Sequence, residues 1–318
     1  MISAIFPGQG SQATGMGKFL YDNFKTAKQT YEEASDAIKL NLVKLCFEGP
    51  DDELQLTPNT QPALLTTSIA TARVLKEVAN IPFNYTAGHS VGEYASFVLA
   101  DVMSFHDAVI AVRKRGEYMQ EAVPLGKGGM IAVMGLDAEQ VAQLCNWAEE
   151  QTGLSPLSPA NYNAPGQVVC SGSQKLIDWL HKNLDKNIFN PPPAKMRLIP
   201  LKVSAPFHCS LMRPAEEKMR SLLEVLPLNN ATLPVVQNFT AYEETASQIL
   251  RENLILQVSG PVKWTQSIEY MCSKGVNKAI ELGHGKVLAG LVKKINAEME
   301  VYNINSLEDL KNLETLQV

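Results

Sequence analysis

The 318-residue sequence lacks the features that stabilise small secreted proteins or anchor proteins in membranes. Its five cysteines are an odd number and are scattered without CxxC spacing, which argues against a disulfide framework and a zinc site. No apolar run approaches the roughly 20 residues that a membrane helix needs. The N-terminal MISAIFPGQG has no basic region of the kind that opens a signal peptide. We therefore expect reduced cysteines, no membrane association and a cytoplasmic location.

Positive and negative charges are also nearly balanced. The chain has 28 lysines and arginines against 33 aspartates and glutamates, a net charge of -5, and no basic block long enough for a nucleic-acid stripe. Its 45% hydrophobic and 19% charged residues are typical of an ordinary globular protein. A chain of this length can bury one large core and carry a smaller lobe beside it. We expect no nucleic-acid partner.

Strand and helix patterns alternate along the chain, which predicts an α/β fold. One helix is predicted over residues 59–78, with Pro62 near the first turn, where a missing N–H group costs nothing. Residues 126–202 instead show a βαββαβ order, which is typical of the ferredoxin-like arrangement. We therefore predict a hydrolase-like α/β core with a parallel sheet, built from residues 1–125 and 203–318. A small ferredoxin-like subdomain is inserted at 126–202.

The stretch GHSVG, residues 88–92, matches the pattern GxSxG. Alone the pattern is weak, since it arises by chance in roughly one chain in ten of this length. Here it lies between a predicted strand and a predicted helix, which is the setting of a nucleophile elbow. This context favours Ser90 as a nucleophile over the alternative, a serine that only caps a helix.

A nucleophilic serine needs a base, and the chain has five candidates: His89, His106, His181, His208 and His284. His89 adjoins Ser90, but successive residues on a tight turn point apart, so we expect it to support the elbow. His208 and His284 each follow a predicted strand. Glu281 and His284 would complete the chain order Ser, acid, His of a hydrolase. Spacing alone does not separate His208 from His284.

A second predicted helix, over residues 104–123, has a charge in the middle of its apolar face. At about 100° per residue, Arg115 shares that face with Met119 and several small apolar residues. Arg113 and Glu117 point to the opposite side, where their i,i+4 spacing suits a solvent-exposed ion pair. A buried arginine keeps its charge, so Arg115 needs an anionic or hydrogen-bonding partner.

The N-terminal loop FPGQGSQA, residues 6–13, matches a loose form of the dinucleotide-binding fingerprint. That fingerprint requires a second strand ending in an acidic residue about 20 positions further on, and this region instead has the pattern of a polar helix. The glycines are better explained by a loop whose backbone N–H groups approach a ligand, as in an oxyanion hole.

Seven motifs, in order over nearly the whole chain, resemble those of the malonyl-CoA:acyl carrier protein transacylases. They are FPGQGSQ, NTQPAL, GHSVGE, RGEYMQ, NYNAPGQVV, APFH and QVSGPVKW. The resemblance implies an acyltransferase of fatty acid biosynthesis. It would carry malonyl from malonyl-CoA to holo acyl carrier protein by a ping-pong mechanism through a malonyl-serine, with no metal or bound cofactor. Two alternatives remain: a freestanding malonyl acyltransferase serving a polyketide synthase, and a serine esterase or thioesterase using Glu281 and His284.

The resemblance also implies which residues carry out the chemistry. His208, the histidine of APFH, would activate Ser90, so that His284 has no catalytic role. The family uses a Ser-His dyad without a carboxylate, and the backbone carbonyl of a glutamine orients the imidazole. That glutamine matches Gln257, which makes Glu281 structural.

Two further groups of residues follow from the same resemblance. The backbone N–H groups of Gln9 and Val91 would form the oxyanion hole, and elbow geometry independently favours Val91. Arg115 would bind the free malonyl carboxylate in bidentate fashion. Met119 and Phe207 are expected to line the substrate pocket. In related polyketide acyltransferases, phenylalanine before the histidine accompanies malonyl rather than branched substrates.

Overall fold

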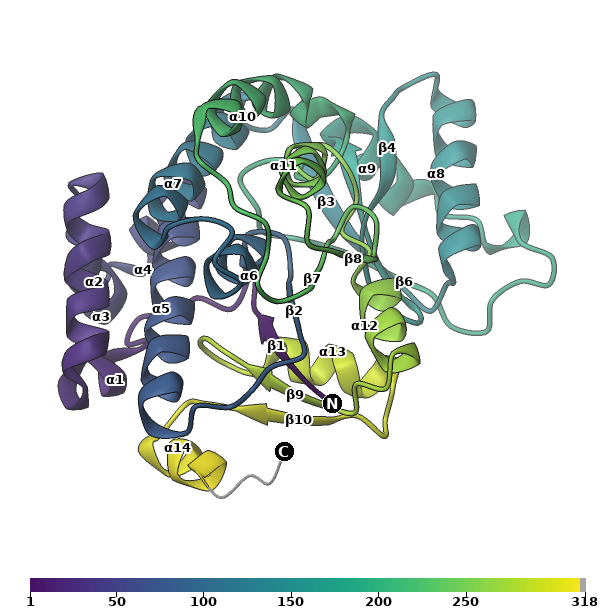
Figure 1. The fold of residues 1–318 in the computed structure, drawn as a ribbon. Coiled ribbons are helices and arrows are strands. Elements are labelled where there is room, and N and C mark those ends of the chain that lie inside the picture. Colours follow the sequence, from purple (N-terminus) through teal and green to yellow (C-terminus); the bar gives the residue numbers. More distant parts are fainter. Residues whose placement is uncertain (315–318) are drawn as a thin grey trace.

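The computed structural model describes residues 1–314, which form two β-sheets with helices packed around them (Figure 1). Residues 315–318 of the predicted core segment 203–318 lie outside this description. The strands of the larger sheet are, in spatial order, β10 (Glu300–Asn303), β9 (Lys278–Glu281), β1 (Ile2–Phe6), β2 (Tyr85–Gly88), β7 (Val235–Val236) and β8 (Glu243–Glu244). The neighbouring strands of this sheet are parallel, except that β7 and β8 are antiparallel.

Strand β1 lies inside the larger sheet, between β9 and β2. All five residues of its sequence ISAIF are buried, as expected for a parallel strand covered on both faces. Successive strands of the chain are added on both sides of β1, β2 and β7 on one side and β9 and β10 on the other. In parallel sheets, ligands bind beside such a switch point, at the carboxyl ends of the strands. Phe6 pairs with Gly88, so the loops that follow β1 and β2 begin next to each other.

The helices of the core cover both faces of the larger sheet. Before β2 come α1 (Lys18–Asn23), α2 (Lys25–Ile38), α3 (Leu42–Glu48), α4 (Asp51–Gln55) and α5 (Thr57–Val78). After it come α6 (Gly92–Leu99), α7 (Phe105–Glu121), α10 (Arg213–Val225), α11 (Ser247–Leu256), α12 (Trp264–Ser273), α13 (Val287–Ile295) and α14 (Leu307–Glu314). Phe6 packs in the cluster formed by α2, α5, α6 and α7, whereas Ile5 packs with α12 and α13 on the other face. Within residues 1–314, no helix is long and apolar enough to cross a membrane.

Helix α5 differs from its prediction at the N-terminus. It begins at Thr57, so Pro62 lies inside the helix rather than near its first turn, and that prediction was wrong. A proline at position 62 leaves the Pro58 carbonyl without its usual helical N–H partner. Arg113 Nη1 donates to this carbonyl at 3.0 Å. Arg113 also forms the predicted ion pair with Glu117, at 2.9 Å, but its contact with α5 leaves the pair only partly exposed.

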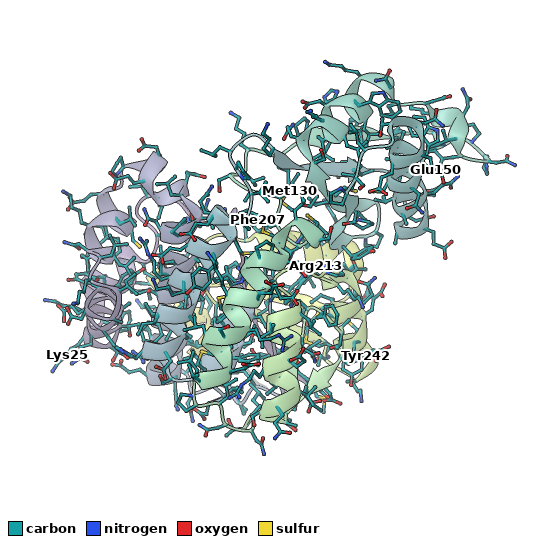
Figure 2. The ribbon with its side chains drawn as sticks, turned by 90° about the horizontal axis from the view of Figure 1, so that it is seen from above. Lys25, Met130, Glu150, Phe207, Arg213 and Tyr242 are labelled. Carbon is teal, nitrogen blue, oxygen red and sulfur yellow. The ribbon has the colours of Figure 1, made fainter. Side chains whose placement is uncertain are left out.

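The smaller sheet is antiparallel and has the strand order β4-β5-β3-β6. In chain order its elements are β3 (Gly128–Met134), α8 (Ala138–Thr152), β4 (Leu157–Ala164), β5 (Gln167–Ser173), α9 (Gln174–Asn183) and β6 (Arg197–Pro200). This βαββαβ unit, with its first strand between the third and the fourth, is ferredoxin-like. The predicted fold class is confirmed. In Figure 2 the unit, marked by Glu150, forms a lobe to one side of the core.

Strand β4 connects the two lobes. Val262 N donates to Ala160 O at 2.8 Å, and Tyr162 N donates to Val262 O at 2.9 Å. Val262 lies in the core segment between α11 and α12, so these two bonds hold the middle of β4 against the core. The smaller sheet is thereby fixed beside the carboxyl ends of the core strands.

Candidate active site

Ser90 lies on a tight turn between β2 and α6. Its φ of 53° is in the left-handed region, which residues other than glycine rarely adopt, and such strain is frequent at functional sites. Both flanking glycines are required by close packing. A Cβ atom on Gly88 would lie 2.0 Å from the Gly92 carbonyl, and one on Gly92 would lie 2.3 Å from the Phe6 carbonyl oxygen. The turn is therefore the strand–elbow–helix arrangement that the sequence predicts.

Gly92→Ala is expected to lower the free energy of unfolding by about 1–3 kcal/mol, because the added methyl group overlaps the backbone of β1. Gly290 in α13 provides the matched control, since a Cβ atom there meets nothing within 4 Å. Gly290→Ala is expected to stabilise the protein by up to about 1 kcal/mol through helix propensity. Denaturant unfolding of both variants measures these changes. A Gly92→Ala protein as stable as the wild type would contradict the close packing at the elbow.

His208 lies directly beside Ser90. Its Nε2 is 2.7 Å from Ser90 Oγ, and its Nδ1 is 2.9 Å from Gln257 O and 3.1 Å from Gly260 O. Carbonyl oxygens only accept, so the ring proton is on Nδ1 and Nε2 is left to accept the serine proton. Burial and the charge of Arg115 lower the pKa of His208 to about 3, so the imidazole is neutral at pH 7.

Arg115 is buried, with 2% of its surface exposed, and its guanidinium reaches the same serine. Its Nη2 donates to Ser90 Oγ at 3.2 Å and to Gln257 Oε1 at 2.9 Å, and its Nη1 donates to Gln61 Oε1 at 2.8 Å. Its Nε–H has no partner, and no carboxylate forms an ion pair with it, in the described part of the chain. A buried cation whose hydrogen bonds go to neutral oxygens is suited to bind a carboxylate beside Ser90.

Asn238 holds the elbow from behind. Its Oδ1 accepts from Ser90 N at 2.7 Å, and its Nδ2 donates to Gly88 O at 2.6 Å. One side chain thus binds the backbone on both sides of His89, and it is fully buried. We infer that Asn238 keeps the strained backbone of Ser90 in place.

Gln9 and Val91 flank Ser90 from two different loops. Neither backbone N–H has a hydrogen-bond partner among residues 1–314. Thr57 Oγ1 donates to Gln9 Oε1 at 3.0 Å, which fixes the loop after β1. Val91 immediately precedes α6, where the first N–H groups of a helix lack internal partners. These are the properties that an oxyanion hole requires.

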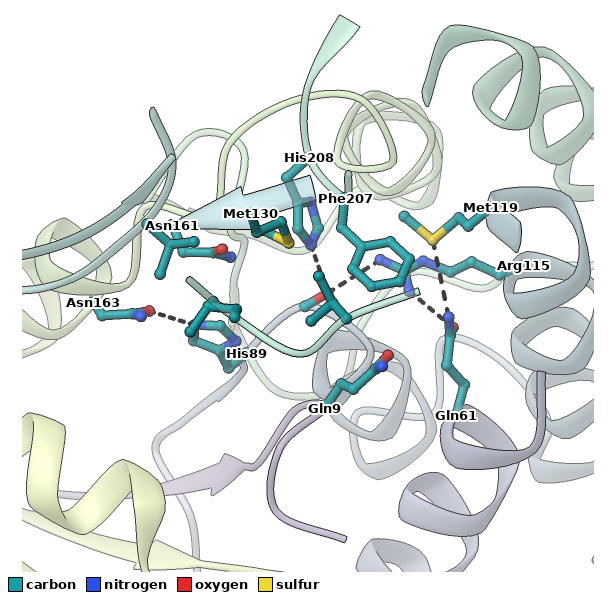
Figure 3. A pocket seen from close by; sticks show the side chains of 14 residues that line it. Gln9, Gln61, His89, Arg115, Met119, Met130, Asn161, Asn163, Phe207 and His208 are labelled. Carbon is teal, nitrogen blue, oxygen red and sulfur yellow. Dashed lines mark hydrogen bonds between the residues drawn. The ribbon is translucent and has the colours of Figure 1, made fainter. Parts of the chain in front are cut away.

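A cavity of about 150 Å³ opens in front of these groups, between the core and the smaller lobe (Figure 3). Among the sequence-predicted site residues, those that border it are Gln9, Ser90, Arg115, Met119, Phe207 and His208. Gln257 and Val91 are not part of the lining. The cavity is also lined by residues to which the sequence assigned no role: Gln61, Met130, Asn161, Asn163, Val169, Leu201 and Val203.

The remaining histidines and Glu281 lie elsewhere or have other contacts. His89 Nε2 is 2.8 Å from Asn163 Oδ1, so its ring faces the smaller lobe. Glu281 accepts from Leu288 N at 3.0 Å and Ala289 N at 2.9 Å, and therefore caps α13. Ser90 Oγ has a hydrogen bond to His208 and none to His284 within residues 1–314. The geometry thus favours the dyad over the rival pair of Glu281 and His284.

Comparison with known proteins agrees with this geometry. The acyl transferase domain family matches residues 4–312. The malonyl CoA-acyl carrier protein transacylase of Bacillus subtilis (strain 168) is 44% identical over 310 residues, covering 98% of this chain and 95% of the relative. The chain belongs to the acyl transferase family, among the malonyl CoA-acyl carrier protein transacylases.

Solved structures of other transacylases share the whole fold. An acyl carrier protein S-malonyltransferase from Vibrio cholerae has a TM-score of 0.91 and 39% identity, over 98% of this chain and 99% of its own. A malonyl-transacylase in complex with a type II polyketide synthase acyl carrier protein has a TM-score of 0.91 and 37% identity, over 98% of both chains. The resemblance drawn from the seven motifs is confirmed.

The lining residues that sequence reasoning missed in this transacylase had different signals. Gln61 lies in the motif NTQPAL. Asn161 and Asn163 alternate in NYNAPGQVV, and alternate residues of a strand share a face. Asn238 lies in no motif, and its position behind the elbow depends on the pairing of β7 with β2.

Proposed function

We propose that this protein transfers malonyl from malonyl-CoA to the phosphopantetheine thiol of holo acyl carrier protein, as a step of fatty acid biosynthesis. The observation that carries the proposal is the buried guanidinium of Arg115 at 3.2 Å from Ser90 Oγ. A cation in this position favours an acyl group that ends in a carboxylate. An acetyl group would leave the cation unpaired, and sites built to bind a polar group discriminate strongly against analogues that lack it.

In the proposed first half-reaction, His208 Nε2 takes the proton of Ser90 as Oγ attacks the thioester carbonyl. The backbone N–H groups of Gln9 and Val91 stabilise the oxyanion of the tetrahedral intermediate. The carbon–sulfur bond breaks, and His208 returns the proton to the departing CoA thiolate. Malonyl remains as an ester on Ser90, with its carboxylate against Arg115.

The second half-reaction repeats these steps with the carrier protein as acceptor. His208 takes the proton of the phosphopantetheine thiol, and the sulfur attacks the ester carbonyl. The bond to Ser90 Oγ then breaks, and the serine regains its proton from His208. The carbonyl of Gln257 keeps a proton on Nδ1 throughout, because it accepts a hydrogen bond from the Nδ1–H group.

The proposal includes no metal or resident cofactor, since the nucleophile, base and carboxylate site are all side chains of the chain itself. It places the reaction in the cytoplasm. The five scattered cysteines without CxxC spacing favour this location, because they do not indicate the disulfide framework of a secreted protein.

Intact-protein mass spectrometry tests the proposal. Incubation with malonyl-CoA is expected to add the mass of one malonyl group to the wild type and none to Ser90→Ala. Holo acyl carrier protein of fatty acid synthesis is expected to discharge the adduct and to gain the same mass. A holo carrier protein from a polyketide synthase, assayed in parallel, tests the alternative acceptor. One of the similar solved structures is a complex of a malonyl-transacylase with such a carrier protein.

Two outcomes would overturn the proposal. An adduct that water discharges as fast as the carrier protein does would indicate a thioesterase. The absence of any adduct at Ser90 would exclude a malonyl-serine intermediate.

A further inference from the structure

Glu93 is a buried carboxylate one turn beyond Ser90 in α6. It is fully inaccessible to solvent, and no lysine or arginine forms an ion pair with it among the described residues. Its partners are Asn238 N at 2.9 Å, Gln237 Nε2 at 3.2 Å and Gln257 Nε2 at 3.1 Å. All three partners are donors, so the site requires a residue that only accepts, which is an ionised carboxylate.

The contact with Gln257 has a consequence for the substrate site. Gln257 Nε2 donates both to Glu93 Oε2 and to Ser90 O. With the amide nitrogen on that side, the amide oxygen points toward Arg115. That oxygen, Oε1, accepts from Arg115 Nη2 at 2.9 Å. If the amide were rotated by half a turn, its NH₂ group would face the guanidinium, donor against donor. The carboxylate of Glu93, together with the carbonyl of Ser90, therefore selects the amide orientation that Arg115 needs.

We propose that Glu93 is a positioning residue for substrate selectivity: by fixing the amide of Gln257, it aims the Arg115 guanidinium at the carboxylate of the acyl group. The inference rests on the proposed malonyl transfer. The carboxylate of Glu93 contacts neither the acyl group nor Ser90 Oγ. It acts through Gln257 on the group that separates malonyl from acetyl.

A merely structural role for Glu93 would have a different signature. Glu93 also accepts from the backbone of Asn238, and Asn238 holds the elbow. A disturbed elbow slows transfer of every acyl group equally, because Ser90 attacks all of them. A misaligned Arg115 slows only the transfer of acyl groups that carry a carboxylate. The ratio of malonyl to acetyl kcat/KM separates the two effects.

Glu93→Ala is the variant that tests the inference. It removes the oxygen that accepts from Gln257 Nε2, whereas Glu93→Gln could keep an amide oxygen at that position for Gln257 Nε2 and the backbone of Asn238. We expect the malonyl-to-acetyl ratio of kcat/KM to fall about tenfold or more, with acetyl transfer changed only a few-fold. An equal loss for both acyl donors, or an unchanged ratio, would overturn the inference.

Glu281→Ala is the matched control. Glu281 is also a fully buried carboxylate whose partners are donors, two backbone N–H groups and Asn303 Nδ2, but it caps α13 away from the cavity. Its replacement is expected to lower stability and to leave the ratio unchanged. A similar fall in the ratio for this variant would show that loss of any buried carboxylate has the effect, and would refute a specific role for Glu93.

The wild type provides a second test that does not depend on the folding of a variant. Burial raises the pKa of Glu93 to about 7, so the proton is bound as the pH falls below that value. The protonated carboxyl group donates a hydrogen bond from its O–H. The oxygen of a rotated Gln257 amide would accept this hydrogen bond. Of the other ionisable groups facing Glu93, Arg115 stays charged and burial holds the pKa of Tyr94 far above neutrality. His208 is the general base for both acyl donors, so its protonation changes both rates alike and does not change their ratio.

We therefore expect the wild-type malonyl-to-acetyl ratio to fall between about pH 8 and about pH 6. A ratio that stays constant over this range would contradict the inference. The same assay keeps the two proposals apart. If the wild type transfers malonyl but the ratio is insensitive to Glu93→Ala and to pH, only the role of Glu93 fails. If the wild type does not transfer malonyl, the proposed function fails.

Discussion

Arg115→Ala is expected to lower kcat/KM for malonyl transfer by roughly 10²- to 10⁴-fold while acetyl transfer is retained or rises. The malonyl carboxylate would lose its buried cationic partner, whereas an acetyl group would no longer face an unpaired charge. The measurement is the rate of transfer to holo acyl carrier protein from each CoA thioester. Equal losses for the two acyl donors would contradict the carboxylate-binding role.

The controls for this variant must separate binding from folding. Arg115 makes three hydrogen bonds to side chains in the buried site, so its removal also affects stability. Arg113→Ala removes an arginine from the opposite side of α7 that bonds Pro58 and Glu117 and does not border the cavity. It is expected to lower the unfolding midpoint without changing the preference for malonyl over acetyl.

His208→Ala is expected to slow acylation of Ser90 by roughly 10²- to 10⁴-fold with either acyl donor, because the serine loses its general base. His284→Ala is expected to have little effect, since Ser90 Oγ bonds to His208 at 2.7 Å. Rapid-quench mass spectrometry of the acyl-enzyme measures both rates. If His284→Ala abolished acylation and His208→Ala did not, a hydrolase-type triad with Glu281 would replace the proposed dyad.

Much of the site was predictable from local sequence because its signals are local. GxSxG between a strand and a helix identified Ser90, and the 3.6-residue period of α7 placed Arg115 on a buried face. Glycines 88 and 92 allow the close backbone contacts of the turn. These inferences need only one turn or one helix to be correct.

The choice between His208 and His284 depends on long-range structure instead. Both follow strands, and spacing along the chain does not tell which loop crosses above Ser90. His208 is brought there because Gln257, 49 residues later, accepts from its Nδ1. Only the family resemblance, which carries such long-range information, separated the two histidines before the structure did.

The smaller lobe and Pro62 show two further limits of sequence reasoning. Asn161 and Asn163 reach the cavity because Val262 pairs with β4, a contact between segments about 100 residues apart. Pro62 is tolerated inside α5 because Arg113, on another helix, donates a hydrogen bond to the Pro58 carbonyl that lacks its helical partner. Both depend on tertiary partners that no local pattern reveals.

The central claim is that Ser90 carries an acyl group whose carboxylate is bound by Arg115. A crystal structure of the wild-type protein, flash-cooled after soaking with malonyl-CoA, tests it most directly. We predict an ester on Ser90 Oγ whose terminal carboxylate lies within hydrogen-bonding distance of the Arg115 guanidinium. A malonyl ester whose carboxylate points into solvent, or an acyl group on another residue, would contradict the account.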